Sequence, residues 1–368
     1  MRRRQGQFAS VRNVPVILDL GHWGLKGIVG DDARRRITIP HALNELNRDD
    51  WNNLVEIGDH AHPGYIQVGT RYYEVGEIAQ RHSAVQAESI ARYRRNYYGV
   101  LMCSVIANLF SPDEIEGAVV FASYPPGDRR HKDDLEASLL GRWEFVNRRR
   151  EYNVTVRQVV SYTEPLGGFW NWVILEAPDG RHYDNRDYDP DRATLVIDLG
   201  GGTMSMLPIG RDQLPDFSMA ESFPIGFNSV ARDFQRELRA NHRDLFRAAR
   251  VLDDGLLHEA LQTGRFYGGG MRDGMDVSTE VSRAMGRLLD QFRAAYERLG
   301  GPMPYGQIIL TGGGSAVLGE HLRMQLNHQR VAYAHDNPHE MHFANVMGGL
   351  KAYRELFGVM DDAAQTDY

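Results

Sequence analysis

Two apolar segments of the chain each end in the tripeptide Asp-Leu-Gly. Residues 14–20 and 193–198 are apolar up to that acid and rich in β-branched side chains, a pattern typical of buried strands. Glycine then permits a tight turn, and a second apolar segment follows at residues 25–30 and 203–209. Each half of the chain is therefore predicted to open with a β-hairpin that has an acidic residue at its corner.

Beyond these hairpins, strand patterns alternate with helical patterns in both halves. This alternation predicts an α/β fold with central mixed sheets. The other predicted strands are residues 34–39, 65–68, 72–75, 118–122, 154–160 and 307–311, and the predicted helices are residues 91–110, 229–240, 243–262, 277–299, 315–327 and a helix that starts at Glu164.

The composition indicates a cytoplasmic globular protein. The chain has 368 residues, 42% of them hydrophobic, and a formal net charge of −7, which argues against nonspecific nucleic-acid binding as its main activity. Its one cysteine, Cys103, excludes an intramolecular disulfide and fits a reducing compartment. No apolar run approaches the ~18 to 20 residues that span a bilayer, and no signal-peptide core follows the basic start. We therefore expect a cytoplasmic protein without a membrane partner.

Three glycine-rich turns are candidates for binding phosphate. Two follow the Asp-Leu pairs, and the third lies between a strand and a helix that begins with Ser315. Bare backbone N–H groups in such turns bind anions, and those at a helix start favour phosphate. Considered one at a time, an Asp-Leu-Gly turn also fits an ordinary glycine-rich hairpin beside a salt-bridged Asp, and the pattern of the third favours a tight strand-to-helix turn that needs glycine for packing alone. The repeated Asp-Leu-Gly favours two related domains whose loops bind a phosphate chain from both sides.

Taken together, the three turns resemble those of the actin-like ATPase superfamily. Its first phosphate loop has the pattern D-x-G-x-x-x-x-K, its second has an acid, a glycine run and a threonine, and its adenosine motif is a threonine or serine followed by glycines. The matching residues are Asp19, Gly21 and Lys26 for the first loop, Asp198, Gly200, Gly201, Gly202 and Thr203 for the second, and Thr311, Gly312, Gly313 and Gly314 for the third. The resemblance covers residues 14–350 and implies an actin-like fold, with two related domains flanking a nucleotide cleft.

Three shorter segments are most similar to the ParM-type plasmid-segregation actins and their archaeal and phage relatives. They read VGTRYYEVGEIA, VVSYTEPLGGFW and HFANVMGGLKAY. With the Asp-rich residues 179–191 as a boundary, this resemblance implies the following organisation: a flexible tail at 1–12, domain I at 13–190 with an inserted subdomain at about 40–110, domain II at 191–337, a segment at 338–358 that completes domain I, and an acidic tail at 359–368.

The resemblance implies that the site binds ATP or GTP together with Mg²⁺. Because Mg²⁺ keeps several waters and takes few carboxylates, we expect Asp19 and Asp198 to hold it through water. Lys26 is expected to neutralise the β- and γ-phosphates as a point charge. The residues expected to bond the phosphates are Gly21, Gly200, Gly201, Gly202 and Thr203, and those expected beside the ribose and α-phosphate are Gly312, Gly313, Gly314 and Ser315.

Two further acids are candidates with an alternative each. Glu164 is expected to orient the attacking water, or it is a helix N-terminal acid stabilised by the helix dipole, with Pro165 at the first helical position. Glu237, or Asp233 in its place, is expected to touch the ribose, or both are solvated helix acids. The first loop also departs from the family, because His22 and Trp23 replace the serine or threonine that meets the γ-phosphate there.

The leading hypothesis is an ATPase that assembles head to tail into filaments, as heterologous contacts allow. The resemblance implies plasmid or other DNA segregation through a DNA-bound adaptor protein, without specific DNA binding by this chain. A small-molecule kinase is the alternative, with Asp128 as its only candidate base, and a scaffold that binds nucleotide without hydrolysis is a third. The arginines at 34–36 and 147–150 are interpreted as solvated faces or filament contacts. The histidines are not expected to bind a metal ion.

Overall fold

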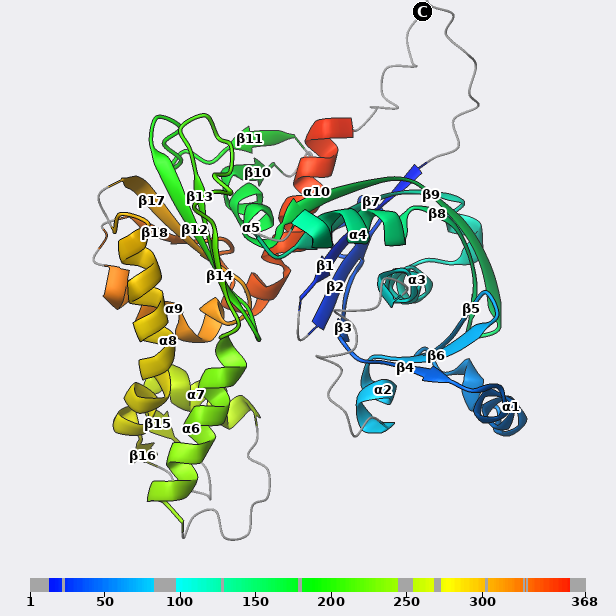
Figure 1. Ribbon diagram of the computed structural model, residues 1–368, viewed down its shortest axis with the longest axis horizontal. Coiled ribbons are helices and arrows are strands. Elements are labelled where there is room, and N and C mark those ends of the chain that lie inside the picture. Colours follow the sequence, from blue (N-terminus) through cyan, green and yellow to red (C-terminus); the bar gives the residue numbers. More distant parts are fainter. Residues whose placement is uncertain are drawn as a thin grey trace, which may run out of the picture. The chain divides into compact units, whose positions relative to one another are not determined.

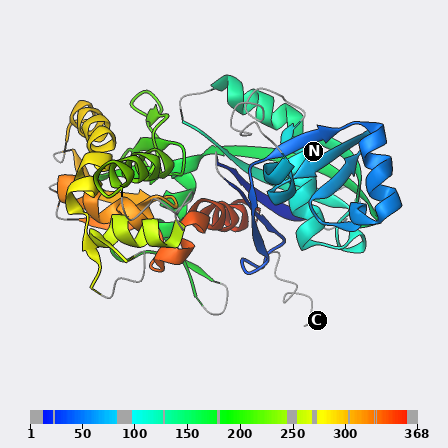
Figure 2. The same cartoon turned by 90° about the horizontal axis from the view of Figure 1, so that it is seen from below.

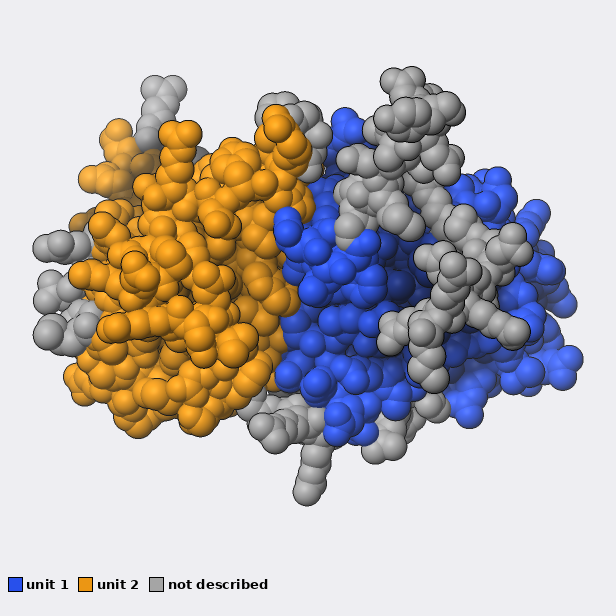
Figure 3. All heavy atoms as spheres, turned by 90° about the horizontal axis from the view of Figure 1, so that it is seen from above, with its two compact units in different colours: residues 1–124, 128–162, 349–368 blue, residues 125–127, 163–348 orange. Residues whose placement is uncertain are grey.

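The computed structural model describes residues 13–21, 24–82, 97–126, 129–177, 181–243, 254–267, 273–301, 304–326, 328 and 330–357. His22, Trp23, Asp128 and the predicted helical residues 91–96 and 244–253 lie outside them. The chain forms two compact units, coloured separately in Figure 3. Unit 1 contains residues 1–124, 128–162 and 349–368, and unit 2 contains residues 125–127 and 163–348.

Unit 1 is built on a nine-stranded sheet with the order β3-β2-β1-β7-β9-β8-β5-β6-β4. Its strands are β1 (Asn13–Leu20), β2 (Gly24–Val29), β3 (Arg36–Pro40), β4 (Leu43–Leu46), β5 (Tyr65–Val68), β6 (Arg71–Val75), β7 (Gly117–Tyr124), β8 (Gly141–Asn147) and β9 (Arg150–Thr163). Its helices are α1 (Arg48–Ile57), α2 (Glu77–His82), α3 (Tyr97–Leu109), α4 (Arg129–Leu139), the short η1 (Asp59–Ala61) and η4 (Pro112–Glu114), and the last part of α10 (Ala344–Phe357).

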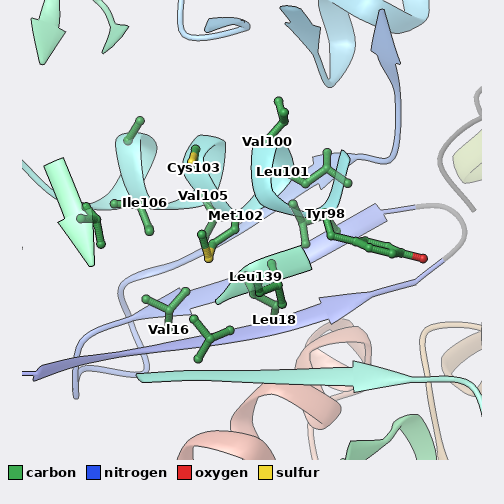
Figure 4. Close-up of a cluster of buried hydrophobic side chains, with 14 of the residues drawn as sticks. Val16, Leu18, Tyr98, Val100, Leu101, Met102, Cys103, Val105, Ile106 and Leu139 are labelled. Carbon is green, nitrogen blue, oxygen red and sulfur yellow. The ribbon is translucent and has the colours of Figure 1, made fainter. Parts of the chain in front are cut away.

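The core of unit 1 forms around α3, which the curved sheet encloses in Figure 1. Residues 97–107 of this helix are all buried, as expected for a helix that is apolar on every side. Figure 4 shows its side chains against Val16 and Leu18 of β1 and Leu139 of α4. Because side chains alternate along a strand, Asp19 lies on the opposite face of β1 from this core.

Unit 2 is built on a five-stranded sheet with the order β14-β13-β12-β17-β18. Its strands are β12 (Ala193–Leu199), β13 (Met204–Ile209), β14 (Glu221–Phe223), β17 (Tyr305–Thr311) and β18 (Val331–Tyr333), and two small hairpins pair β10 (Ile174–Glu176) with β11 (His182–Asp184) and β15 (Arg265–Phe266) with β16 (Met275–Asp276). Its helices are α5 (Glu164–Val173), α6 (Phe227–Asn241), α7 (Asp254–Thr263), α8 (Ser278–Arg298), α9 (Ser315–Leu326), η6 (Pro338–Phe343) and the start of α10.

The two faces of the second sheet are covered by different helices. Leu195, Ile197 and Leu199 of β12 join the core formed with α6, α8 and α9, the group of helices that Figures 1 and 2 show together. The alternate residues Val196 and Asp198 therefore lie on the other face. Helix α5 contacts β12, β13 and β17 there, and this packing places Asp198 on the same side of the sheet as α5.

Both sheets contain the same arrangement of strands, which confirms the predicted α/β fold of two related domains. In each, an antiparallel hairpin (β1–β2 or β12–β13) has a parallel neighbour (β7 or β17) on its first strand. The strands of the expected insertion join the first sheet through β8. The units divide at residue 162 rather than at the expected 190, because α5 packs on the second sheet.

Candidate functional site

The first loop adjoins a partly buried ion pair in unit 1. Asp19 and Lys26 are directly opposite each other in the β1–β2 hairpin, and Lys26 Nζ lies 2.9 Å from Asp19 Oδ2. Ser123 is the partner of Asp19 on the parallel strand β7, and its hydroxyl donates to Asp19 Oδ1 at 2.9 Å. Asp19 is only 3% exposed. The carboxylate is therefore fixed by one contact to each oxygen.

Gly21 leaves room beside the lysine. A Cβ at this position would lie 2.9 Å from Lys26 Nζ and 3.3 Å from the Gly24 carbonyl oxygen, so a larger residue would crowd the ammonium. His41 Nδ1 donates to the Gly21 carbonyl oxygen at 2.8 Å. A partly buried ion pair adds little net stability because both charges lose water, and its position at a glycine turn suits anion binding instead.

The second loop forms the turn between β12 and β13 in unit 2. The Gly200 N–H donates to the Thr203 carbonyl oxygen at 2.8 Å, which closes the turn. The Gly200 and Gly201 carbonyl oxygens accept from the N–H groups of Phe227 and Asn228 at the start of α6. These bonds satisfy two of the four N–H groups that a helix start leaves without intrahelical partners. The loop is therefore anchored to α6 through its carbonyls.

The third loop packs directly on the end of β12. Gly312 has φ +85°, and a Cβ there would overlap Asp198 Oδ1. The Gly314 N–H donates to the Leu199 carbonyl oxygen at 2.8 Å. Ser315 is buried, and its hydroxyl donates to the Thr311 carbonyl oxygen at 2.6 Å. The second and third loops thus meet at Asp198, while the Ser315 hydroxyl is used within its own helix start.

Asp198 is also held by a residue that is distant in sequence. It is 6% exposed, and Asn345 at the start of α10 donates from Nδ2 to Asp198 Oδ2 at 2.8 Å. Glu164 is 7% exposed and is the first residue of α5, with Pro165 following it. Since Asp198 lies on the α5 face of the sheet, both acids belong to one side of unit 2.

The two candidate ribose-binding acids lie along α6. Glu237 Oε2 is 3.6 Å from Arg283 Nη1 on α8, and Asp233 Oδ1 is 3.1 Å from Arg236 Nη2 on its own helix. Glu237 follows the start of α6 by ten residues, which corresponds to about 15 Å of helix. Its nearest ion pair therefore ties α6 to α8.

A hollow adjoins the third loop. Its volume is about 590 Å³, which falls within the usual range for small-ligand sites. Ser315 and Val317 of α9 line one side, and Tyr333 and Met341 line another. The start of α9 therefore borders both the Asp198 region and a space large enough for a small molecule.

Comparison with known proteins shows which proteins this chain resembles. Residues 18–167 match the family model described as the actin-like proteins N-terminal domain. Alp7A, an actin-like protein, is 14% identical, with 94% of this chain and 97% of that chain covered and a TM-score of 0.67. The archaeal actin homologue Ta0583 is 17% identical, with coverage of 93% and 99% and a TM-score of 0.67. The chain therefore has an actin-like fold.

The similarity in fold extends to assembled and nucleotide-bound structures. ParM in a 15-stranded filament from Clostridium botulinum is 17% identical, with 94% of this chain and all of that chain covered and a TM-score of 0.61. Ta0583 in complex with ADP is 16% identical, with coverage of 93% and 99% and a TM-score of 0.63. No curated protein matches the chain in sequence. The expected resemblance to actin-like proteins and the expected fold are confirmed.

Sequence reasoning missed the residues that hold the two aspartates. Ser123 is the polar residue next to the end of the apolar strand β7, where it signals a strand terminus near a site, and Asn345 stands within the segment HFANVMGG. Either signal is weak without the fold, because these residues contact aspartates 104 and 147 positions away in sequence. In the part of the chain that the structure describes, no helix is both long and apolar enough to cross a membrane.

Proposed function

We propose that this chain is an actin-like protein that binds ATP or GTP with Mg²⁺, hydrolyses the nucleotide, and assembles into filaments under control of that cycle. The observation that carries the proposal is the buried Asp198 carboxylate, on which two glycine loops converge at the end of β12. Actin-like neighbours solved with ADP and as filaments support it. The similarity to ParM supports a role in segregating plasmid or other DNA through an adaptor protein.

The residues present fit a magnesium ion. Mg²⁺ takes oxygen ligands, keeps several waters and is held by one or two carboxylates plus phosphates. Asp198 supplies a buried carboxylate fixed by Asn345, and Gly312 leaves space over Asp198 Oδ1 where a Cβ would overlap it. Asp198 and Asp19 would hold the ion through water. When bound, the ion neutralises charge on the phosphates.

The chain's own groups supply positioning and charge, which phosphoryl transfer mainly requires. Lys26 directs its ammonium to phosphate oxygens, in exchange for part of its contact with Asp19. The N–H groups of Gly201 and Gly202 and the Thr203 hydroxyl donate to phosphate. Their carbonyl neighbours are already bonded to α6, so the loop does not need to reorganise to present those donors.

Glu164 orients the attacking water in this proposal. Its position at the first turn of α5 and its burial keep the carboxylate in one region of the site. A carboxylate that accepts a proton or hydrogen bond from water helps only when it is held within reach of it. Hydrolysis then weakens contacts between successive subunits of the filament.

The test measures light scattering and phosphate release together after ATP or GTP is added with Mg²⁺. Wild type is expected to show scattering that rises and then decays as phosphate appears. Asp198→Ala is expected to lose phosphate release, whereas Asp191→Ala, which removes an exposed carboxyl from the same unit, is expected to behave as wild type. Phosphate release without any scattering change contradicts the proposal that the chain forms filaments. Absence of nucleotide binding contradicts the entire proposed function.

A further inference from the structure

Asn345 makes a side-chain hydrogen bond to a residue far from α10 in the sequence. It is the second residue of the helix, it is 5% exposed, and its Nδ2 donates to Asp198 Oδ2 at 2.8 Å. The acceptor is itself 6% exposed. A hydrogen bond between two groups removed from water, one of them charged, is among the stronger kinds. This contact joins residues 147 positions apart.

The contact fixes which way the carboxylate points. With Oδ2 bonded to Asn345, Oδ1 lies over Gly312, where a Cβ would overlap it. The Asn345 amide at one oxygen and Gly312 against the other both constrain the carboxylate plane. Removing the amide would take away one constraint on rotation about the Cβ–Cγ bond, a torsion that is broad by itself.

The same residue borders the helix that begins with Glu164. A Cβ on Gly167 would lie 2.5 Å from the Asn345 carbonyl oxygen and 2.8 Å from its Cα. Gly167 is three residues after Glu164, so both lie on one side of α5. A Cβ on the next residue, Gly168, would lie 2.5 Å from Thr311 Oγ1, and Thr311 is the β17 neighbour of Asp198. These close approaches form one packed cluster.

We propose that Asn345 is a positioning residue for hydrolysis: its amide orients the Asp198 carboxylate for magnesium, and its backbone sets the distance of α5 from that carboxylate. The proposal rests on the function proposed above. Groups that orient a metal-binding carboxylate typically change metal affinity or activity about 10- to 100-fold when removed. Asn345 therefore acts on magnesium dependence more than on nucleotide affinity itself.

The test compares three variants of the full chain. Asn345→Leu removes the amide at similar volume, and Asn345→Asp replaces it with a carboxyl of the same shape. Asn171→Leu is the matched control, because Asn171 is equally buried at 5% and donates to the Ala334 carbonyl oxygen at 2.7 Å instead. Phosphate release is measured against Mg²⁺ concentration and pH, and urea unfolding shows which variants are folded.

Asn345→Leu is expected to raise the Mg²⁺ concentration for half-maximal hydrolysis by about 10- to 100-fold, while Asn171→Leu leaves it unchanged. Asn345→Asp places two carboxyls together, so one of them holds its proton to higher pH. We expect the acid limb of the pH profile to move up by about one unit or more. This arm also tests the proposal if Asn345→Leu does not fold.

Three results would overturn the proposal in distinguishable ways. If Asn345→Leu and Asn345→Asp keep the wild-type magnesium and pH dependence while Asp198→Ala is inactive, Asn345 only packs, and the proposed function stands. If Asn171→Leu changes magnesium dependence as much as Asn345→Leu, the effect comes from general damage to the packing. If wild type does not bind magnesium-nucleotide, this inference and the proposed function both fail.

Discussion

At the scale of single residues, Gly312 shows that one position of the candidate site must meet both a backbone and a side-chain requirement. The left-handed conformation of Gly312 turns the chain from β17 into α9, and its lack of a side chain brings the backbone against Asp198. Both requirements fall on one position, and each excludes other residues for a separate reason. A left-handed conformation costs an L-residue about 1–2 kcal/mol, and overpacking adds typically about 1–3 kcal/mol.

Gly312→Ala is therefore expected to lower the free energy of unfolding by about 2–5 kcal/mol, the sum of these two costs. Gly286→Ala is the matched control: this glycine lies within α8, and no atom lies within 4 Å of an added Cβ. It is expected to raise stability by about 0.5–1 kcal/mol, because alanine is the better helix former. Urea unfolding measures both, and equal stability of the two variants would mean that the Asp198 carboxylate moves aside freely.

At the scale of elements, α6 and α8 are joined by a buried acid. Glu280 in the first turn of α8 is 7% exposed, and its Oε1 lies 3.0 Å from Asn241 Nδ2 and 3.1 Å from His242 Nε2 at the end of α6. Burial by itself raises the pKa of Glu280, but the hydrogen bonds from Asn241 and His242 outweigh it and lower the pKa below the usual 4.5. The ionised form is thus favoured by folding.

The direction of this pKa shift determines how the free energy of unfolding depends on pH. When a carboxyl has a lower pKa in the folded protein than in the unfolded chain, it stabilises the fold at pH values above the unfolded-state pKa. That contribution is lost as the pH falls through the folded-state pKa. The stability difference between wild type and Glu280→Gln is expected to be constant just above pH 4.5 and to shrink as pH falls below it. Urea unfolding at successive pH values measures it, with Asp290→Asn, an exposed acid of α8, as control. A difference that grows toward acid pH would contradict the assignment.

At the scale of the whole molecule, charge bears on the choice of partners. The chain carries 49 acidic and 42 basic side chains, apart from histidine. Several arginines of the two basic clusters have partners within the protein: Arg34 with Asp32 at 3.0 Å, Arg35 with Glu114 at 3.3 Å, Arg148 with Asn108 at 2.9 Å and Arg149 with His60 at 3.2 Å. These contacts favour the interpretation of the clusters as ordinary protein surface.

We therefore predict that the chain alone does not bind duplex DNA at physiological salt. Proteins that bind DNA nonspecifically do so with Kd of about 10⁻⁴–10⁻⁶ M under those conditions, through phosphate contacts. Fluorescence anisotropy of a labelled duplex, titrated with protein to about 10 µM in ATP and in ADP, measures it. Binding that weakens steeply as salt rises would contradict the prediction and would make an adaptor unnecessary.

The sequence by itself determined the two acid-ended hairpins, the glycine turns after them, and the actin-like fold that their order implies. These features are local, because strand pattern, turn glycine and terminal acid all lie within about a dozen residues of one another. It also indicated the start of α5 at Glu164, where an acid and a proline favour a helix N-terminus.

Only the tertiary structure decided which groups hold those acids. Ser123 reaches Asp19 because β7 runs parallel to β1 in matching register, and Asn345 reaches Asp198 because the start of α10 packs against α5. The insertion strands joined the first sheet and α5 joined the second for the same kind of reason. The two aspartates are separated from these partners by 104 and 147 residues, and all of these contacts exist only after the sheets and helices have packed.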